Sequence, residues 1–146
     1  MIDGVGPASY VNRLDHPETT AEGDDLLVPM RVAPEFFVEP NDPDPRGMTV
    51  IALDRKPAGT IVDLWIDRSE PQIRYMEVET AAPAGPRRVL LPIHYCRIDG
   101  KAGTVKVSSI LSTQFANVPG LASPDRITSR EEDRIVAYYG GGTLYA

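Results

Sequence analysis

The chain has 146 residues, of which 42% are hydrophobic and 25% are charged, a composition typical of a single soluble globular domain. The formal net charge is −6, and residues 1–45 hold ten acidic but only two basic side chains, which argues against binding nucleic acid or anionic lipid. The sequence shows no apolar run long enough to span a bilayer and no signal peptide, and its single cysteine, Cys96, excludes an internal disulfide.

Residues 1–45 are predicted to form an extended, proline-rich segment, because seven prolines interrupt any helix there. Two short strands are expected within this segment, over "LLVPMRV" (26–32) and "EFFVE" (35–39). The following "NDPDPRG" (41–47) is typical of a turn.

Residues 46–112 are predicted to form a small β-barrel, because short strands with tight turns follow one another. The expected strands cover residues 48–53, 59–67, 74–80, 88–98 and 104–110. Pro92 indicates an edge strand or a bulge, and residues 99–103 indicate a hairpin turn. Alternation along the second and third of these strands predicts that Asp63, Trp65, Asp67, Tyr75, Glu77 and Glu79 point outward, opposite Val62, Leu64, Ile66, Met76 and Val78.

Residues 113–146 are predicted to be a connection followed by one helix, at about 128–139. Thr128 stands three residues before Glu131, which is the spacing of a capping box, and the glycines at 140–142 favour a stop. The fold expected for residues 1–146 is therefore one mostly-β domain with a C-terminal helix.

The segment 63–79 contains five carboxylates, and paired carboxylates can hydrolyse glycosidic bonds. Alternation places most of them on outward faces, where strand carboxylates are normally solvated, so no hydrolase site is predicted. His94 and Cys96 share one face of a predicted strand, and we interpret them as packing neighbours rather than a nucleophilic couple. The "EGDD" stretch (22–25) lacks the spacing of a calcium loop, so no metal site is predicted. We therefore expect that the chain is not an enzyme.

Several long stretches resemble the H subunit of the photosynthetic reaction centre of purple bacteria, and the resemblance extends over essentially the whole chain. They are "DGVGPASY" (3–10), "GTIVDLWIDRSE" (59–70), "RYMEVE" (74–79), "SSILSTQFANVPGL" (108–121) and "REEDRIVAYYGGGTLYA" (130–146). Within this resemblance, residues 48–111 are similar to the PRC-barrel module.

The resemblance implies that the domain caps the L and M subunits on the cytoplasmic face of the photosynthetic membrane. It implies that the domain stabilises the quinone region and assists proton transfer to the secondary quinone. No cofactor is expected on this chain, because the quinone and bacteriochlorophyll are held by partner subunits in the family. Family members begin with a transmembrane helix that this sequence lacks, so a soluble fragment of the cytoplasmic domain is expected, with a natural soluble paralogue as the alternative.

The resemblance also implies roles for particular residues. It places Glu70, with Arg74 and Asp67 beside it, in a cluster that faces the proton network near the quinone. A carboxylate in such a place can accept and pass protons, and an arginine can balance charge as electrons arrive. Glu22 and Asp24 stand where some family members carry histidines, and together with Asp25 they mark a candidate surface at which protons enter. Metal binding through imidazole is not carried over to these positions.

A free-standing PRC-barrel adaptor that binds a cytosolic protein is the alternative. Residues 3–10 and 108–121 lie at or beyond the ends of the barrel and still resemble the reaction-centre family, which favours the reaction-centre interpretation.

Overall fold

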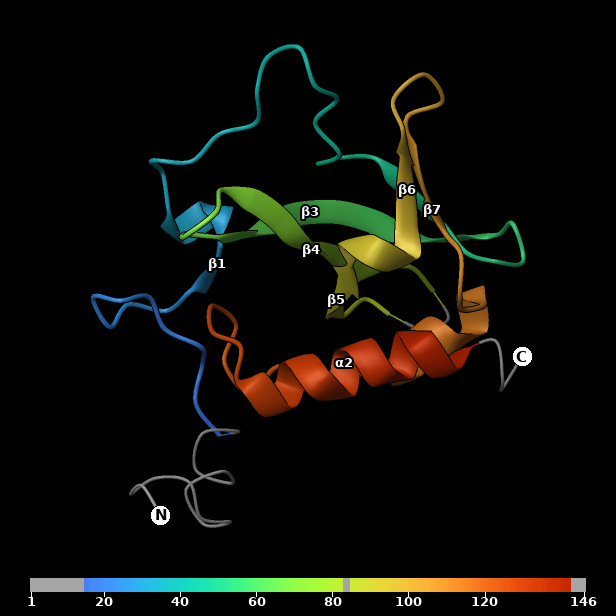
Figure 1. The fold of residues 1–146 in the computed structure, drawn as a ribbon. Coiled ribbons are helices and arrows are strands. Elements are labelled where there is room, and N and C mark those ends of the chain that lie inside the picture. The colour runs from blue at the N-terminus through green and yellow to red at the C-terminus, as the bar shows by residue number, and fades with distance from the viewer. Residues whose placement is uncertain (1–14, 83–84, 143–146) are drawn as a thin grey trace.

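The computed structural model describes residues 15–82 and 85–142 of the chain, so the predictions for residues 1–14 and 143–146 lie outside the described residues. The described part is mostly β, with one α-helix and three short 3-10 turns (Figure 1). The elements are β1 (Leu27–Pro29), η1 (Met30–Val32), β2 (Thr49–Ile51), β3 (Pro57–Asp67), β4 (Gln72–Thr80), β5 (Arg88–Pro92), η2 (Ile93–Tyr95), β6 (Cys96–Asp99), β7 (Thr104–Val107), η3 (Ser112–Asn117) and α2 (Ser129–Gly141).

The strands form one sheet in the order β5-β4-β3-β2-β7-β6, and β1 pairs with β3 beyond the end of β2. All of these pairs are antiparallel except β2 with β7, which is parallel. Figure 1 shows the β6–β7 hairpin turned steeply away from β3 and β4, with α2 lying along the opposite side. The sheet is not closed, but its order and bend are those of a small barrel-like fold, as expected.

The longest pair of strands, β3 and β4, is interrupted by two bulges. Ile61 pairs with Val78 and Asp63 with Glu77, so Val62 is an extra residue on β3; in the same way, Arg74 is an extra residue on β4. A bulge shifts the alternation of side chains between the two faces of a sheet.

The prediction that the carboxylates of β3 and β4 lie on a solvated face is wrong for most of them. Every residue from Asp63 to Asp67 is buried, which shows that both faces of β3 are covered at this end. The exposed fraction is 5% for Asp63, 7% for Asp67 and 4% for Glu77, whereas Glu79 is exposed as predicted. Trp65 and Tyr75, which were also expected to point outward, belong to the core.

Prolines explain two further differences from the predicted strands. The strand expected over 26–32 ends at Pro29 and continues as η1, and the strand expected over 88–98 ends at Pro92 and resumes as β6 after η2. Proline cannot donate to a sheet ladder, so a strand commonly stops there. β5 is an edge strand, as Pro92 indicated, but residues 35–39 form no strand.

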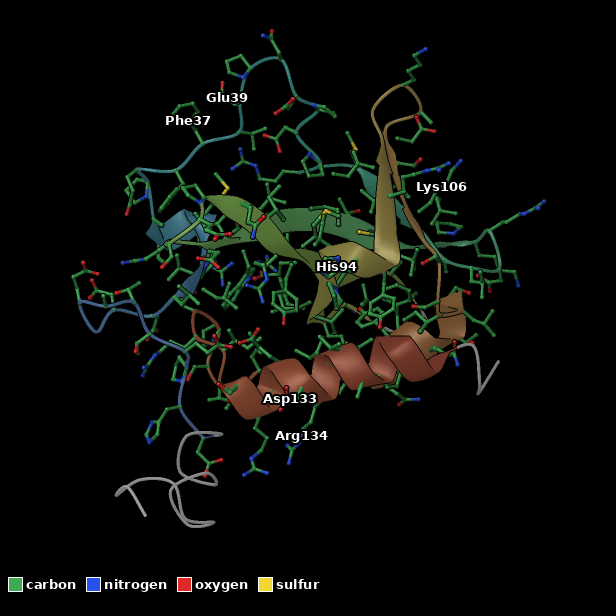
Figure 2. The ribbon with its side chains drawn as sticks, viewed as in Figure 1. Phe37, Glu39, His94, Lys106, Asp133 and Arg134 are labelled. Carbon is green, nitrogen blue, oxygen red and sulfur yellow. The ribbon has the colours of Figure 1, made fainter. Side chains whose placement is uncertain are left out.

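Helix α2 begins as its capping box predicts. The Thr128 hydroxyl accepts a hydrogen bond from the Glu131 N–H (3.1 Å), and the Glu131 carboxylate accepts one from the Thr128 N–H (2.9 Å). The helix continues to Gly141, two residues beyond the predicted end. Ile135 and Tyr139 are buried, and the Tyr139 ring stacks on Tyr95 with centroids 6.1 Å apart, which fixes α2 against the sheet. Asp133 and Arg134 point away from the sheet in Figure 2.

Candidate functional site

The turn between β3 and β4 is held by Asp67, one of the three residues of the predicted proton-transfer cluster. Its Oδ1 accepts hydrogen bonds from the backbone N–H groups of Ser69 (2.8 Å) and Glu70 (3.2 Å). Its Oδ2 lies 3.3 Å from Nη1 of Arg74, the bulged residue of β4. A buried carboxylate that accepts two backbone donors and one guanidinium is well satisfied, so it keeps the turn in one conformation.

Glu70 occupies the exposed tip of this turn. Its backbone is bound to Asp67, but its side chain is exposed, and no hydrogen bond or ion pair joins its carboxylate to another described residue. The structure therefore brings Asp67 and Arg74 together, as predicted, and presents the Glu70 side chain to whatever surrounds the domain.

Glu132 of α2 extends the cluster and was not predicted. Its Oε1 accepts a hydrogen bond from the Tyr75 hydroxyl (2.8 Å) and lies 4.0 Å from Nη2 of Arg74. Its Oε2 is buried without a hydrogen-bond partner among the described residues. Burial raises the pKa of the Glu132 carboxyl and also that of the Tyr75 hydroxyl. Asp67, Arg74, Glu132 and Tyr75 thus form one chain of polar groups from the β3–β4 turn to α2.

Helical spacing is the signal that could have found Glu132. It lies three residues before Ile135 and seven before Tyr139, so all three share the buried face of α2. A carboxylate on the apolar face of a predicted helix is unusual, because burying a charge without a partner costs free energy.

A second buried cluster surrounds Glu77 on β4. Its Oε1 accepts hydrogen bonds from the Trp65 indole N–H and from Arg31, both at 2.9 Å, and its Oε2 accepts one from Arg88 at 3.0 Å. Burial alone would raise the pKa of Glu77, but these three donors outweigh it and hold the pKa below its ordinary value. The Glu77 carboxylate is buried and both of its oxygens are paired, while the Arg31 and Arg88 side chains reach the surface, so we interpret the cluster as structural.

Arg31, which follows β1 in η1, joins this cluster to two other parts of the chain. Its Nη1 lies 2.9 Å from both Asp63 Oδ2 and Glu77 Oε1. Its Nη2 contacts Asp125 at 2.8 Å and donates to the Pro124 carbonyl at 2.6 Å. One side chain therefore links the N-terminal segment, the sheet and the loop that precedes α2.

The three residues of the predicted surface at which protons enter lie in different surroundings. Glu22 and Asp24 are exposed in the turn before β1. Asp25 is half-buried and forms an ion pair with Arg126, whose Nε lies 2.9 Å from its Oδ2. Of these three carboxylates, those of Glu22 and Asp24 form no ion pair with another described residue.

The prediction that His94 and Cys96 share one face of a strand is wrong. His94 is exposed in η2, whereas Cys96 is half-buried at the start of β6 and its thiol lies 3.5 Å from the Ile93 carbonyl. Burial raises the pKa of the Cys96 thiol to about 12, so the reactive thiolate is not populated at neutral pH. Within residues 15–82 and 85–142, no group of three or more His, Cys, Asp or Glu side chains is placed to hold a metal ion.

Comparison with known families places this geometry in context. Residues 38–111 match the family model of the PRC-barrel domain, which is half of the chain. The chain belongs to the PRC-barrel family. Residues 1–32 match a second family model, that of the photosynthetic reaction centre H-chain N-terminal region.

The two matches together confirm the resemblance to the reaction-centre H-chain family that the sequence indicated. The PRC-barrel match covers β2 to β7 and most of the loop before β2, including Asp67, Glu70 and Arg74. The H-chain match covers β1, η1 and the turn that carries Glu22 and Asp24. Within the described residues, no helix has both the length and the hydropathy needed to cross a membrane.

Proposed function

We propose that this chain caps the L and M subunits of a photosynthetic reaction centre on the cytoplasmic face of the membrane and assists proton transfer to the secondary quinone. In this role it is a structural subunit and not an enzyme. The partner subunits hold the quinone and the bacteriochlorophyll, and this chain supplies protonatable side chains near them. The H-chain match over residues 1–32 lies outside the barrel and favours this function over that of a generic PRC-barrel adaptor.

The observation that carries the proposal is the way Asp67 holds the β3–β4 turn. Two backbone hydrogen bonds and the contact with Arg74 fix the turn, while the Glu70 carboxylate at its tip stays exposed. A proton-transfer group works best when rigid neighbours position it and its carboxylate can reach a donor and an acceptor. Glu70 meets this requirement once a partner covers the turn.

Glu132 supplies a second protonatable group behind the turn. Because burial raises its pKa, Glu132 holds its proton to a higher pH than an exposed glutamate does. Arg74 lies between Asp67 and Glu132, so a change of charge on either carboxylate is felt by the other. This coupling supports the proposal that the cluster responds as a unit when the nearby quinone is reduced.

The test is Glu70→Gln in a reaction centre reassembled from this chain and H-depleted core particles. Removing one titratable group near the acceptor should slow the proton-coupled second reduction of the secondary quinone by about a hundredfold, the lower end for loss of a general acid–base group. Primary charge separation should be unchanged, because it involves no proton. The measurement is the kinetics of quinone reduction after the second of two flashes.

Glu79→Gln is the matched control, because Glu79 is also an exposed glutamate but lies within β4, at the end of the strand away from the β3–β4 turn. It should leave the second-flash kinetics as they are in the unmodified complex. Unchanged kinetics in Glu70→Gln would contradict the relay role of Glu70, and failure of the folded chain to bind core particles would contradict the capping role.

A further inference from the structure

An apolar groove lies between the loop that follows η1 and the sheet. It has a volume of about 360 Å³. The loop contributes Phe36, Phe37 and Val38, and β3 and β4 contribute Ile66 and Ile73. Figure 1 shows this loop arching over the sheet on the side away from α2. The lining of this groove contains no residue of the predicted proton-transfer cluster (Asp67, Glu70 and Arg74) and none of the Glu77 cluster.

Phe37 makes this groove unlike the rest of the described surface. Its exposed fraction is 71%, whereas those of the other exposed large hydrophobic residues, Val32, Leu53 and Val136, are 40–44%. Figure 2 shows Phe37 and Glu39 on the outer loop, with the Phe37 ring directed away from the sheet. An exposed aromatic side chain at the mouth of an apolar groove is typical of a binding hot spot.

The rim of the groove is acidic. Glu39 and Asp42 line it and are exposed, and its lining contains no lysine or arginine. Along the chain, the exposed Glu35 and Glu70 precede the lining residues Phe36 and Pro71. Basic side chains line two adjoining hollows instead: Arg97 and Lys101 line one that shares Pro43 and Ile98 with the groove, and Arg31, Arg46 and Arg88 line another that shares Met30 and Phe36 with it. The lining of the groove itself therefore favours a ligand that combines apolar groups with positive charge.

We propose that the groove receives a polypeptide segment with an apolar side chain flanked by lysine or arginine, supplied by a cytoplasmic loop of the membrane-embedded core. Cytoplasmic loops of membrane proteins carry an excess of Lys and Arg, which complements this rim. The same acidic rim repels anionic lipid headgroups, so the membrane surface itself is not the occupant. This inference rests on the proposed function and names the surface through which the chain docks.

The position of the groove connects docking with the proton cluster. Pro71 and Gln72, which follow Glu70 in the β3–β4 turn, line the groove. A segment bound there lies against this turn and excludes water beside it. Docking through the groove therefore brings the Glu70 carboxylate up to the partner that it is proposed to serve.

The experiment measures binding of this chain to H-depleted reaction-centre core particles. Phe37→Asp should raise the Kd by about thirtyfold, the loss typical of removing an aromatic hot-spot residue. Phe37→Ala should raise it less but in the same direction, and neither variant should change the fold because the ring is exposed. Leu53→Asp is the matched control, since it places the same charge at another exposed apolar position, and its Kd should equal that of the unmodified chain.

The charge of the occupant is tested by the double variant Glu39→Lys with Asp42→Lys. It should weaken binding at low salt and reduce the salt dependence of the Kd, because the complementary charges are lost. An unchanged Kd in this variant would overturn the basic character assigned to the occupant.

The outcomes separate this inference from the proposed function. Tight binding by the unmodified chain and equally tight binding by Phe37→Asp would overturn docking through the groove and leave the capping function intact. No binding by the folded unmodified chain would overturn both. A dimer of the isolated chain that sedimentation equilibrium detects and that Phe37→Asp abolishes would instead assign the groove to a second copy of the chain.

Discussion

Two buried glutamates, Glu77 and Glu132, show how the surroundings of a side chain decide its charge. Both are more than nine-tenths buried. Glu77 accepts three hydrogen bonds from Trp65, Arg31 and Arg88, and its pKa lies below the ordinary value. Glu132 has one close donor, Tyr75, and its pKa lies above the ordinary value because burial dominates.

These shifts predict opposite effects of pH on stability. Glu77 stabilises the fold above its ordinary pKa, and this contribution is lost as the pH falls through the lowered value. The stabilisation that Glu132 provides is fully present below its ordinary pKa of 4.5, and is lost as the pH rises through the raised value. Above that point the native state contains a buried carboxylate, one oxygen of which accepts no hydrogen bond from the described residues.

Glu132→Gln should therefore flatten the dependence of stability on pH. The amide keeps an acceptor for the Tyr75 hydroxyl but does not titrate, so the variant should gain stability relative to the unmodified chain as the pH rises from the ordinary pKa of a glutamate through the raised pKa of Glu132. The measurement is the free energy of unfolding in urea at several pH values. Glu22→Gln removes an exposed carboxylate from the turn before β1 and should follow the unmodified curve; parallel curves for Glu132→Gln and the unmodified chain would contradict the prediction.

The sequence identified part of this site. Asp67 and Arg74 were predicted through the family resemblance, and the structure brings them within 3.3 Å. Glu132 could not be joined to them from the sequence, because Tyr75 and Glu132 are 57 positions apart and meet only when α2 packs on the sheet. Asp63 and Glu77 were placed on a solvated face because strict alternation takes no account of a bulge at Val62 or of a distant Arg31.

At the scale of elements, local signals located most strands and the helix. Alternation predicted β3 and β4 to within two residues at each end, and the capping box predicted the start of α2. The end of α2 was predicted too early, because glycine only weakens a helix and packing of Tyr139 extends it. The "EFFVE" segment has the composition of a strand, but no neighbouring strand pairs with it, and it lines the groove instead.

Thr128→Ala tests how far α2 depends on its cap. The substitution removes the acceptor of the Glu131 N–H and should lower the free energy of unfolding by about 1 kcal/mol. For a domain of this size the melting temperature should fall by about 2–4 °C, as followed by far-UV circular dichroism. Thr113→Ala, at an exposed position of η3, should leave the melting temperature unchanged; an equal fall in both variants would show that the cap contributes nothing specific.

At the scale of the whole molecule, segments from both ends of the described chain pack against the sheet. β1 and η1 lie against β3, and α2 packs on the sheet through Ile135 and Tyr139. A single core of buried residues runs through all of these elements. Arg31 adds polar links between the same parts, because it binds Asp63 and Glu77 in the sheet and Asp125 in the loop before α2.

Arg31→Met should therefore destabilise the whole domain rather than one end of it. The change leaves Asp63 and Glu77 buried with fewer donors and should cost about 3 kcal/mol, near the lower end for breaking a buried ion pair because one-third of the Arg31 side chain is exposed. Trp65 fluorescence reports the sheet and far-UV circular dichroism reports α2, and both urea transitions should move together. Arg46→Met removes an exposed ion pair with Asp44 and should change stability by less than about 0.5 kcal/mol. If α2 unfolded at a lower urea concentration than the sheet in Arg31→Met, the two would be separate cooperative units, and Arg31 would be the link that normally couples them.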